Sequence, residues 1–195
     1  MKKSFLVIFI VFITLGCTAC INRFAVQELN NNAKELLAKG QTEAAIARLE
    51  SSIDLDESIF ETHYNLAVAY MQAKLYDKAL KALEKVQELK PDFADTYHSI
   101  AVINEELAYD ILSGENDKDK KLSNTEQNDE NSDKTKDLSD EDKTKICEYF
   151  TIAIDNYNKY LTKKENADDK DKIEQKINDL NNNLRKYGDN TDKAE

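Results

Sequence analysis

The chain has 195 residues, which is enough for one domain with a sizeable core. Its 38 acidic side chains outnumber its 27 basic ones, and the formal net charge is −11. Because nucleic acids and anionic lipid surfaces repel an acidic protein, this balance excludes nucleic-acid binding and polybasic membrane patches. The four glycines cannot form a phosphate-binding loop, and the three cysteines do not make a disulfide framework.

The first sixteen residues have the pattern of a secretory signal. Lys2 and Lys3 give a basic start, and residues 5–16 are apolar apart from Thr14. About a dozen apolar residues are too few for a membrane-spanning helix, which needs roughly 20. A charged start, an apolar centre and a small residue before the cleavage point are typical of a signal peptide. We therefore expect the chain after this segment to lie outside the cytoplasm.

Residues 13–17, Ile-Thr-Leu-Gly-Cys, resemble a bacterial lipobox. In that family the signal is cut before the cysteine, and the cysteine carries the lipid anchor. Gly16 fits the small residue before the cut, whereas Thr14 stands where leucine is usual. The resemblance implies that Cys17 is lipidated, with Cys20 as the alternative. A plain signal peptide or an uncut anchor is the competing interpretation.

A period of 34 residues runs through the next part of the chain. The residues that recur at this spacing are Leu29, His63 and Tyr97, then Ala33, Ala67 and Ala101, and the pairs Ala45 with Ala79 and Leu49 with Leu83. Small and large residues thus return at the same points of a helix–turn–helix unit. Such a period predicts a stacked all-α array, and arrays of this kind hold partners more often than they perform chemistry.

The apolar pattern divides the first two units into helix pairs. The first helix covers 26–39 and ends at Gly40, which can adopt the left-handed conformation of a helix cap. The second helix begins at Thr42 and presents one apolar face, made of Ala45, Ile46, Leu49 and Ile53. The next pair covers 59–74 and 76–90. Pro91 ends it, because proline cannot continue a helix.

The second unit closely resembles the tetratricopeptide repeat. The residues that carry the resemblance are Tyr64-Asn65-Leu66-Ala67, Tyr70, Tyr76, Ala79, Leu83 and Pro91. The first unit fits less well, as expected of a terminal repeat. The resemblance implies an all-α array in which the first helix of each unit lines a concave groove, and a function in protein binding without catalysis.

The third unit is interrupted between its two helices. Residues 92–112 form a long amphipathic pattern, but a charged run at 113–145 follows, and it has too few apolar residues to offset the cost of ordering. Extending the repeat from Ala79 predicts a small residue at 113. Ala153 is the fitting candidate, 153 − 113 = 40 positions late. Two unrelated domains joined by a linker are the alternative.

The last helical pattern, 169–186, is apolar on one side only. Its apolar residues are Ile173, Ile177, Leu180, Leu184 and, just beyond, Tyr187. This pattern suits a helix that caps the open end of the stack, with a coiled-coil strand for a partner as the alternative. The predicted organisation is a signal peptide at 1–16, a lipid-anchored tether at 17–25, repeat helices at 26–112, a disordered insert at 113–145, the second helix of repeat three and the capping helix at 146–187, and a tail at 188–195.

The resemblance also implies which side chains line the concave groove. They are Tyr64, Asn65, Val68, Met71, Gln72, His98, Val102 and Glu105, with Asn30, Lys34 and Glu106 beside them. Asn65 matches an asparagine that in many family members binds a peptide backbone, although it can also be a consensus residue without a ligand.

The family's basic clamp for C-terminal carboxylates is incomplete here. Of its cations only Lys34 is present, and the third unit offers Asp95 and Ser99 instead. We therefore expect no chaperone-tail binding of that type. Glu105 and Glu106 favour a partner with basic or polar segments.

No catalytic or metal-binding pattern stands out. His63 and His98 have no Cys or carboxylate cluster at ligand spacing, and the run beginning at Asp117 lacks the third oxygen ligand and the glycine of a calcium loop. We predict a non-enzymatic bacterial envelope lipoprotein without cofactor or metal, on the outer membrane if the host has one. It would hold another protein, and resemblance to known repeat lipoproteins suggests envelope complex assembly. The alternative is a surface-exposed ligand-binding or antigen lipoprotein.

Overall fold

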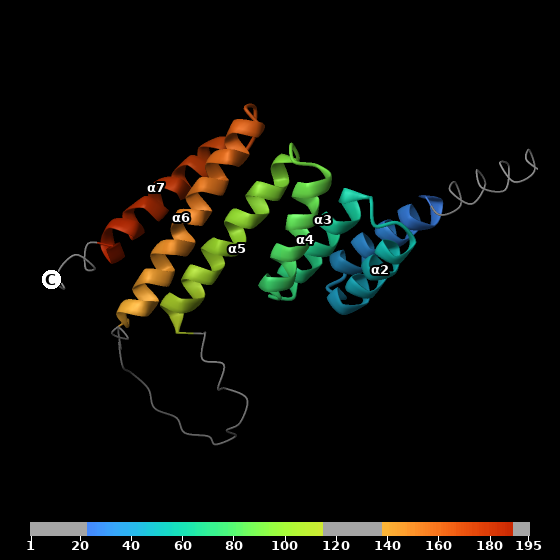
Figure 1. Ribbon diagram of the computed structural model, residues 1–195, viewed down its shortest axis with the longest axis horizontal. Coiled ribbons are helices and arrows are strands. Elements are labelled where there is room, and N and C mark those ends of the chain that lie inside the picture. Colours follow the sequence, from blue (N-terminus) through green and yellow to red (C-terminus); the bar gives the residue numbers. More distant parts are fainter. Residues whose placement is uncertain (1–22, 115–137, 189–195) are drawn as a thin grey trace, which may run out of the picture. The chain divides into compact units, whose positions relative to one another are not determined.

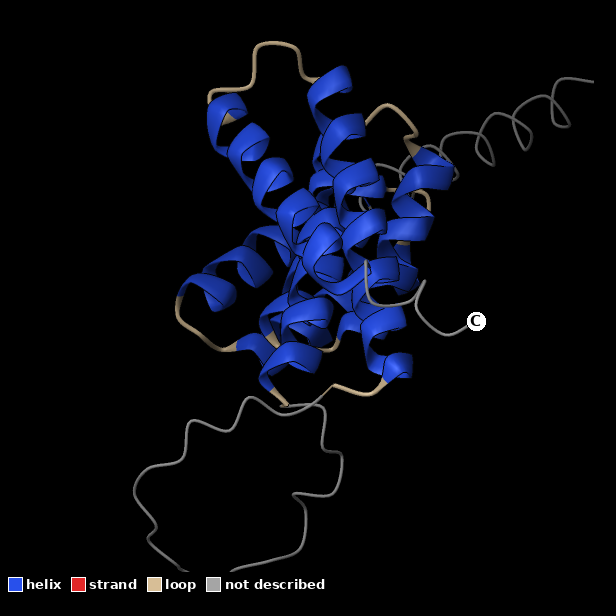
Figure 2. Ribbon diagram, turned by 90° about the vertical axis from the view of Figure 1, so that its left-hand side faces the viewer, coloured by secondary structure: helices blue, strands red, loops and turns tan. Residues whose placement is uncertain are grey.

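The computed structural model describes residues 23–114 and 138–188, and these ranges contain only helices and the turns between them (Figures 1 and 2). The first described helix spans residues 23–38 and is called the N-terminal helix here. The others are α2 (Thr42–Leu55), α3 (Phe60–Gln72), α4 (Tyr76–Leu89), α5 (Ala94–Ser113), α6 (Asp140–Lys163) and α7 (Lys170–Gly188). Cys17, Cys20 and most of the predicted insert lie outside the described residues. No helix within the described ranges is long and apolar enough to cross a bilayer.

The chain divides into two compact units, Met1–Thr96 and Tyr97–Glu195, with the division just inside the start of α5. In the first unit α3 packs against both α2 and α4. The core of this unit contains the residues of the 34-residue period. Ala33, Ala45, Ala67 and Ala79 are fully buried, as are Leu49 and Leu83. The small residues let helices approach closely, so the sequence period is confirmed as a packing repeat.

The same turn joins the two helices of each of the first two repeats. Gly40 has a φ of +73°, and the Gln41 amide donates to the Leu36 carbonyl at 2.9 Å. Thirty-four residues later, the Leu75 amide donates to the Tyr70 carbonyl at 2.8 Å. This is the six-to-one hydrogen bond of a Schellman cap, as the glycine at 40 predicted. The residue equivalent to Gly40 is Lys74, which adopts a φ of 55° despite its side chain.

In the second unit α7 packs against α6. Ile146, Phe150, Ala153 and Tyr157 of α6 are fully buried, and Ile173 and Leu180 anchor α7. The other apolar residues of α7 (Ile177, Leu184 and Tyr187) are half-buried, and most of its polar residues are exposed. The apolar face of α7 therefore packs against α6 of the same chain.

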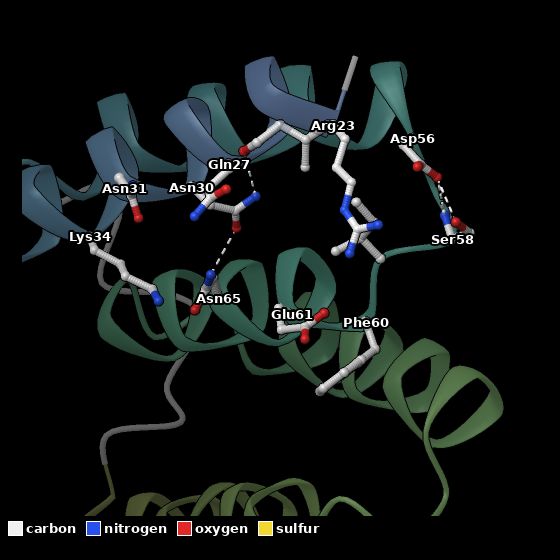
Figure 3. A pocket seen from close by; sticks show the side chains of 12 residues that line it. Arg23, Gln27, Asn30, Asn31, Lys34, Asp56, Ser58, Phe60, Glu61 and Asn65 are labelled. Carbon is white, nitrogen blue, oxygen red and sulfur yellow. Dashed lines mark hydrogen bonds between the residues drawn. The ribbon is translucent and has the colours of Figure 1, made fainter. Parts of the chain in front are cut away.

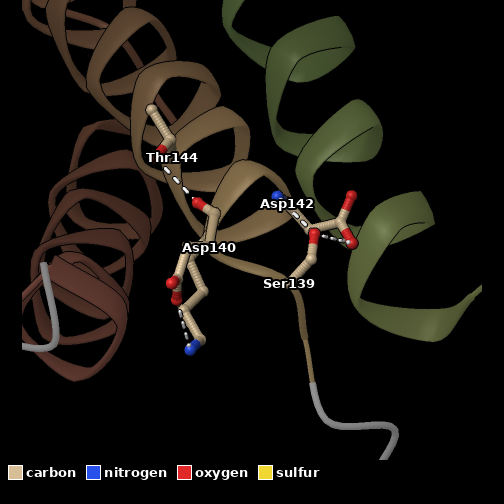
Figure 4. A network of polar contacts seen from close by, with 5 residues as sticks. Ser139, Asp140, Asp142 and Thr144 are labelled. Carbon is tan, nitrogen blue, oxygen red and sulfur yellow. Dashed lines mark hydrogen bonds and ion pairs between the residues drawn. The ribbon is translucent and has the colours of Figure 1, made fainter.

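Helix α6 begins earlier than its apolar pattern indicated. Residues 140–145, which were expected to belong to the insert, already form its first turns (Figure 4). The Ser139 hydroxyl oxygen accepts from the Asp142 amide at 3.1 Å, which is an N-cap. Three acidic residues in the first turn stabilise the helix, because their negative charges interact favourably with the positive end of the helix dipole. These turns carry no buried apolar residue until Ile146, and apolar periodicity therefore missed them.

Candidate partner-binding cleft

The first unit contains an open cleft of about 590 Å³ between the N-terminal helix and the start of α3 (Figure 3). Its lining is mostly polar. The residues around it are Arg23, Val26, Gln27, Asn30, Asn31, Lys34, Asp56, Ser58, Ile59, Phe60, Glu61 and Asn65. They come from three segments of the first unit: the N-terminal helix, the turn after α2 and the first turns of α3.

One wall of the cleft is a polar stripe on the N-terminal helix. Arg23, Gln27, Asn30 and Lys34 follow each other at spacings of four, three and four. Residues at these spacings share one face of an α-helix. The stripe therefore places a guanidinium near one end of the cleft, carboxamides in the middle and an ammonium near the other end (Figure 3).

Asn30 lies at the base of this wall and is only 8% exposed. Its amide nitrogen lies 2.9 Å from the Val26 carbonyl, 3.0 Å from the Ser52 hydroxyl and 2.9 Å from the Thr62 hydroxyl. Its amide oxygen accepts from the Asn65 amide nitrogen at 2.8 Å. The polar atoms of Asn30 thus all have partners in the protein. Asn30 was expected to line the groove, and the structure gives it the further role of positioning Asn65.

Asn65 is half-buried and stands on the opposite wall (Figure 3). Because Asn30 takes one of its N–H groups, the orientation of the Asn65 carboxamide is restricted. Within the described residues its side-chain oxygen accepts no hydrogen bond. A carboxamide held in this way can donate to and accept from a peptide main chain.

The turn after α2 closes one end of the cleft. The Asp56 carboxylate accepts from the Ser58 hydroxyl at 2.6 Å and from the Ser58 amide at 3.0 Å. These two hydrogen bonds hold the pKa of Asp56 below its usual value, and the positive charge of Arg23 acts in the same direction. Asp56 therefore stays ionised at neutral pH and contributes a negative charge to this end.

The other groove residues predicted on α3 lie outside the cleft. Tyr64 is half-buried and packs edge-on against Phe93, with ring centroids 5.0 Å apart. Val68 and Met71 are half-buried and Gln72 is exposed. Of the predicted α3 residues only Asn65 lines the cleft. The remaining four, Tyr64, Val68, Met71 and Gln72, stay candidate contact residues on α3.

The predicted groove residues of the third repeat belong to the second unit. The ring of His98 contacts Tyr157 and Tyr160, with centroids 5.7 Å and 5.1 Å away. Val102 is half-buried. The Glu105 carboxylate accepts from the Tyr157 hydroxyl at 2.6 Å and from the Lys176 ammonium at 2.7 Å.

Glu105 therefore has a structural role between α5, α6 and α7. Burial, and then the hydrogen bond to Glu105, raise the pKa of Tyr157. Glu105 and Glu106 were expected to favour a partner with basic or polar segments. Glu105 no longer supports this expectation, because its carboxylate is already paired with Lys176 inside the protein. Glu106 is exposed.

Of the twelve lining residues, sequence reasoning placed only Asn30, Lys34 and Asn65 in the groove, and the nine that it missed include Arg23, Gln27, Asn31 and Glu61. Arg23 fell in the segment predicted as a tether, because the apolar pattern starts only at Val26. The sequence does contain a signal for this wall of the cleft: the polar residues Arg23, Gln27, Asn30 and Lys34 recur at helical spacing, just as the apolar residues of the same helix do.

The described residues contain no group of three or more His, Cys, Asp and Glu side chains that could hold a metal ion. His63 is buried, and its ring nitrogen lies 2.8 Å from the Glu57 carbonyl oxygen. Cys147 is half-buried, and burial raises the pKa of its thiol. Both residues are therefore accounted for by packing.

Comparison with known proteins agrees with this architecture. A tetratricopeptide repeat model matches residues 60–93, and a TPR repeat model matches residues 33–74. No curated protein sequence matches the chain. Among solved structures, the first TPR domain of Spaghetti (RPAP3), bound to the HSP90 peptide SRMEEVD, is similar. It is 14% identical, with a TM-score of 0.51, over 85% of this chain and 92% of that chain.

The Sgt2 TPR domain from Aspergillus fumigatus is similar as well. It is 13% identical, with a TM-score of 0.54, over 87% of this chain and 83% of that chain. At such low identity these likenesses show the fold alone. The matched repeat models cover the same helices whose small residues form the repeating core. Residues 33–93 therefore carry tetratricopeptide repeats, and the protein has the fold of a tetratricopeptide-type helical array.

Proposed function

We propose that the protein is a lipid-anchored scaffold of the bacterial cell envelope that holds a segment of another protein in the cleft of its first unit. Tetratricopeptide repeats indicate a protein–protein interaction scaffold. The observation that carries the proposal is the Asn65 carboxamide, which Asn30 orients in a cleft that two further carboxamide-bearing residues, Gln27 and Asn31, also line.

The dimensions of the cleft suit an extended peptide. Arg23 and Lys34 are 11 positions apart on one helix. At 1.5 Å per residue this is about 16 Å, a length that an extended chain covers with about five residues. Gln27, Asn31 and Asn65 face this path, and carboxamides pair with main-chain N–H and C=O groups. The site therefore suits main-chain recognition of a short segment.

The comparisons support a peptide ligand and leave its type open. The similar domain of Spaghetti (RPAP3) holds a short HSP90 peptide. The carboxylate clamp expected for such tails is incomplete in this chain, because Asp95 and Ser99 stand at two of its cationic positions. A different segment of a partner protein is therefore the expected ligand.

The proposal of a membrane anchor rests on the sequence that precedes the described residues. A basic start, a short apolar run and a cysteine at position 17 support cleavage and lipidation there. A single acyl chain binds a bilayer only marginally, so a stable anchor needs more than one chain. Tethering would confine the cleft to the membrane plane and raise the local concentration of envelope partners.

The peptide-binding proposal is tested by screening a displayed library of random peptides against the full-length protein. We expect an enriched set that binds the wild type and loses roughly fivefold in affinity with Asn65→Ala, since one main-chain hydrogen bond is worth about 1 kcal/mol. Asn32→Ala is the matched control, because Asn32 is exposed on the N-terminal helix and does not line the cleft.

Circular dichroism of each variant separates lost binding from lost folding. Two results would overturn the proposal. One is the absence of any enrichment over an empty surface. The other is an enriched set that binds Asn65→Ala, correctly folded, as tightly as the wild type.

A further inference from the structure

The two ends of the cleft carry opposite net charge. At one end stands the Lys34 ammonium, with the carboxamides of Asn31 and Asn65 beside it (Figure 3). The other end holds the guanidinium of Arg23 and the carboxylates of Asp56 and Glu61, one positive charge against two negative ones. The protein thus presents a short dipole along the cleft.

The charges that define this dipole are available to a ligand. Within the described residues, no ion pair joins Lys34, Arg23 or Glu61 to another side chain. Lys34 and Glu61 are exposed. Asp56 is bound by Ser58 and near Arg23, so Glu61 is the carboxylate of this end that has no hydrogen-bond partner among the described residues.

The positions of Lys34, Asn65 and Glu61 follow one another along the cleft. Glu61 precedes Asn65 by four residues, which places the two on one face of α3, about 6 Å apart along its axis. Lys34 extends from the facing helix toward Asn65, on the side away from Glu61 (Figure 3). A peptide main chain bound at Asn65 therefore has the ammonium on one side and the carboxylate on the other.

We propose that the cleft selects dipolar peptide segments, in which an acidic residue pairs with Lys34 and a basic residue pairs with Glu61 on either side of a main-chain contact at Asn65. The inference rests on the proposed function, because it names the ligand of the same cleft. The length of the cleft sets the spacing: the acid and the base are about four residues apart, since an extended chain covers roughly 3.3 Å per residue.

Segments of a single charge sign are disfavoured by the same geometry. An all-acidic segment would place carboxylates against Asp56 and Glu61, and the net charge of −11 would slow its approach. An all-basic segment would meet Lys34 and Arg23. The dipolar order alone leaves each end of the ligand opposite a charge of the other sign.

The test uses synthetic peptides built on a sequence enriched in the library screen. Four versions are compared: acid and base in each order about four residues apart, all-acidic and all-basic. We expect one dipolar order to bind best, by about two- to fivefold for each exposed charge pair. This preference should vanish near 1 M salt, where the Debye length is about 3 Å.

The decisive variant is the charge swap Lys34→Glu/Glu61→Lys, which should reverse the preferred order of the two charges in the peptide. The matched controls are Lys39→Glu and Glu28→Lys. They make the same changes on exposed residues of the N-terminal end of the chain that do not line the cleft, and should leave the order unchanged.

The outcomes separate this inference from the function on which it rests. If peptides bind through Asn65 but the wild type shows no preference between the two orders, dipolar selection is refuted and the peptide scaffold stands. The same conclusion follows if the folded charge swap keeps the wild-type preference. If no peptide binds the full-length protein, both the inference and the proposed function are refuted.

Discussion

Two threonines at equivalent positions of successive repeats should respond in opposite ways to the same substitution. Thr62 of α3 and Thr96 of α5 are 34 positions apart, and both are fully buried. The Thr62 hydroxyl accepts from the Asn30 carboxamide at 2.9 Å. The Thr96 hydroxyl has no hydrogen-bond partner among the residues that the structure describes. The two sites therefore share a repeat position but differ in the pairing of one polar atom.

The difference has a cause in the sequence. Counting 34 residues on from Asn30 and Ser52, which form the polar network around Thr62, leads to Tyr64 and Val86. No carboxamide or hydroxyl of the same size stands at these positions in the second repeat. The threonine is kept while its partners have changed, and the hydroxyl at 96 is buried without a hydrogen bond to any described residue.

We expect Thr62→Val to lower the free energy of unfolding by about 1–2 kcal/mol, because Asn30 loses a buried acceptor. Thr96→Val should raise it by about 1 kcal/mol, because an unpaired buried hydroxyl is replaced by a methyl group of similar size. The expected gap between the two variants is therefore about 2–3 kcal/mol, well above the few tenths that denatured-state effects contribute.

The measurement is urea unfolding of the full-length protein followed by circular dichroism, with the midpoints compared at equal slopes. Both substitutions make the same chemical change at the same repeat position, so each serves as the control of the other. If Thr96→Val destabilises the protein as much as Thr62→Val, the Thr96 hydroxyl has a partner in solution and the reasoning fails.

Three further changes test other parts of the molecule. Lys74→Gly should raise the free energy of unfolding by about 1 kcal/mol, because φ at this residue is 55° and glycine tolerates that region; an unchanged or lower urea midpoint would contradict the strain. Burial, and then the hydrogen bond to Glu50, raise the pKa of Tyr70 from 10 to about 12. Between these two pH values the folded protein therefore keeps the Tyr70 hydroxyl proton, whereas the unfolded chain loses it. Wild-type stability should therefore fall more steeply than that of Tyr70→Phe between pH 10 and 12, and parallel pH profiles in urea titrations would refute this. Cys17→Ser should abolish incorporation of a labelled fatty acid in a bacterial host while Cys20→Ser retains it; the opposite pattern would move the anchor to Cys20.

The cleft and the core depend on the same polar network. Asn30 connects α2, α3 and its own helix through Ser52, Thr62 and Val26, and it also orients Asn65. A change at Asn30 should therefore reduce both stability and peptide affinity. A change at Gln27 or Asn31, which are exposed, should affect affinity alone. This contrast separates the residues that build the site from those that only line it.

The repeat architecture was predictable from the sequence because small and large apolar residues recur every 34 positions. That spacing identified Ala33, Ala67, Ala45 and Ala79 as helix contacts, and all four are fully buried. Gly40 likewise indicated the turn, since a left-handed residue is needed there. Asn65 was the one cleft residue identified on α3, through its resemblance to the repeat family.

Periodicity and composition alone determined the helical class, the repeat length and the buried face of each helix, because hydrophobic burial follows the helical period. Tertiary structure alone decided what each polar side chain does. Glu105 pairs with Lys176, which lies 71 positions away in the sequence, and Asn65 donates to Asn30, which lies 35 positions away. Such partners come from distant segments brought together by packing, and no local pattern distinguishes a polar residue that faces a ligand from one that pairs within the fold.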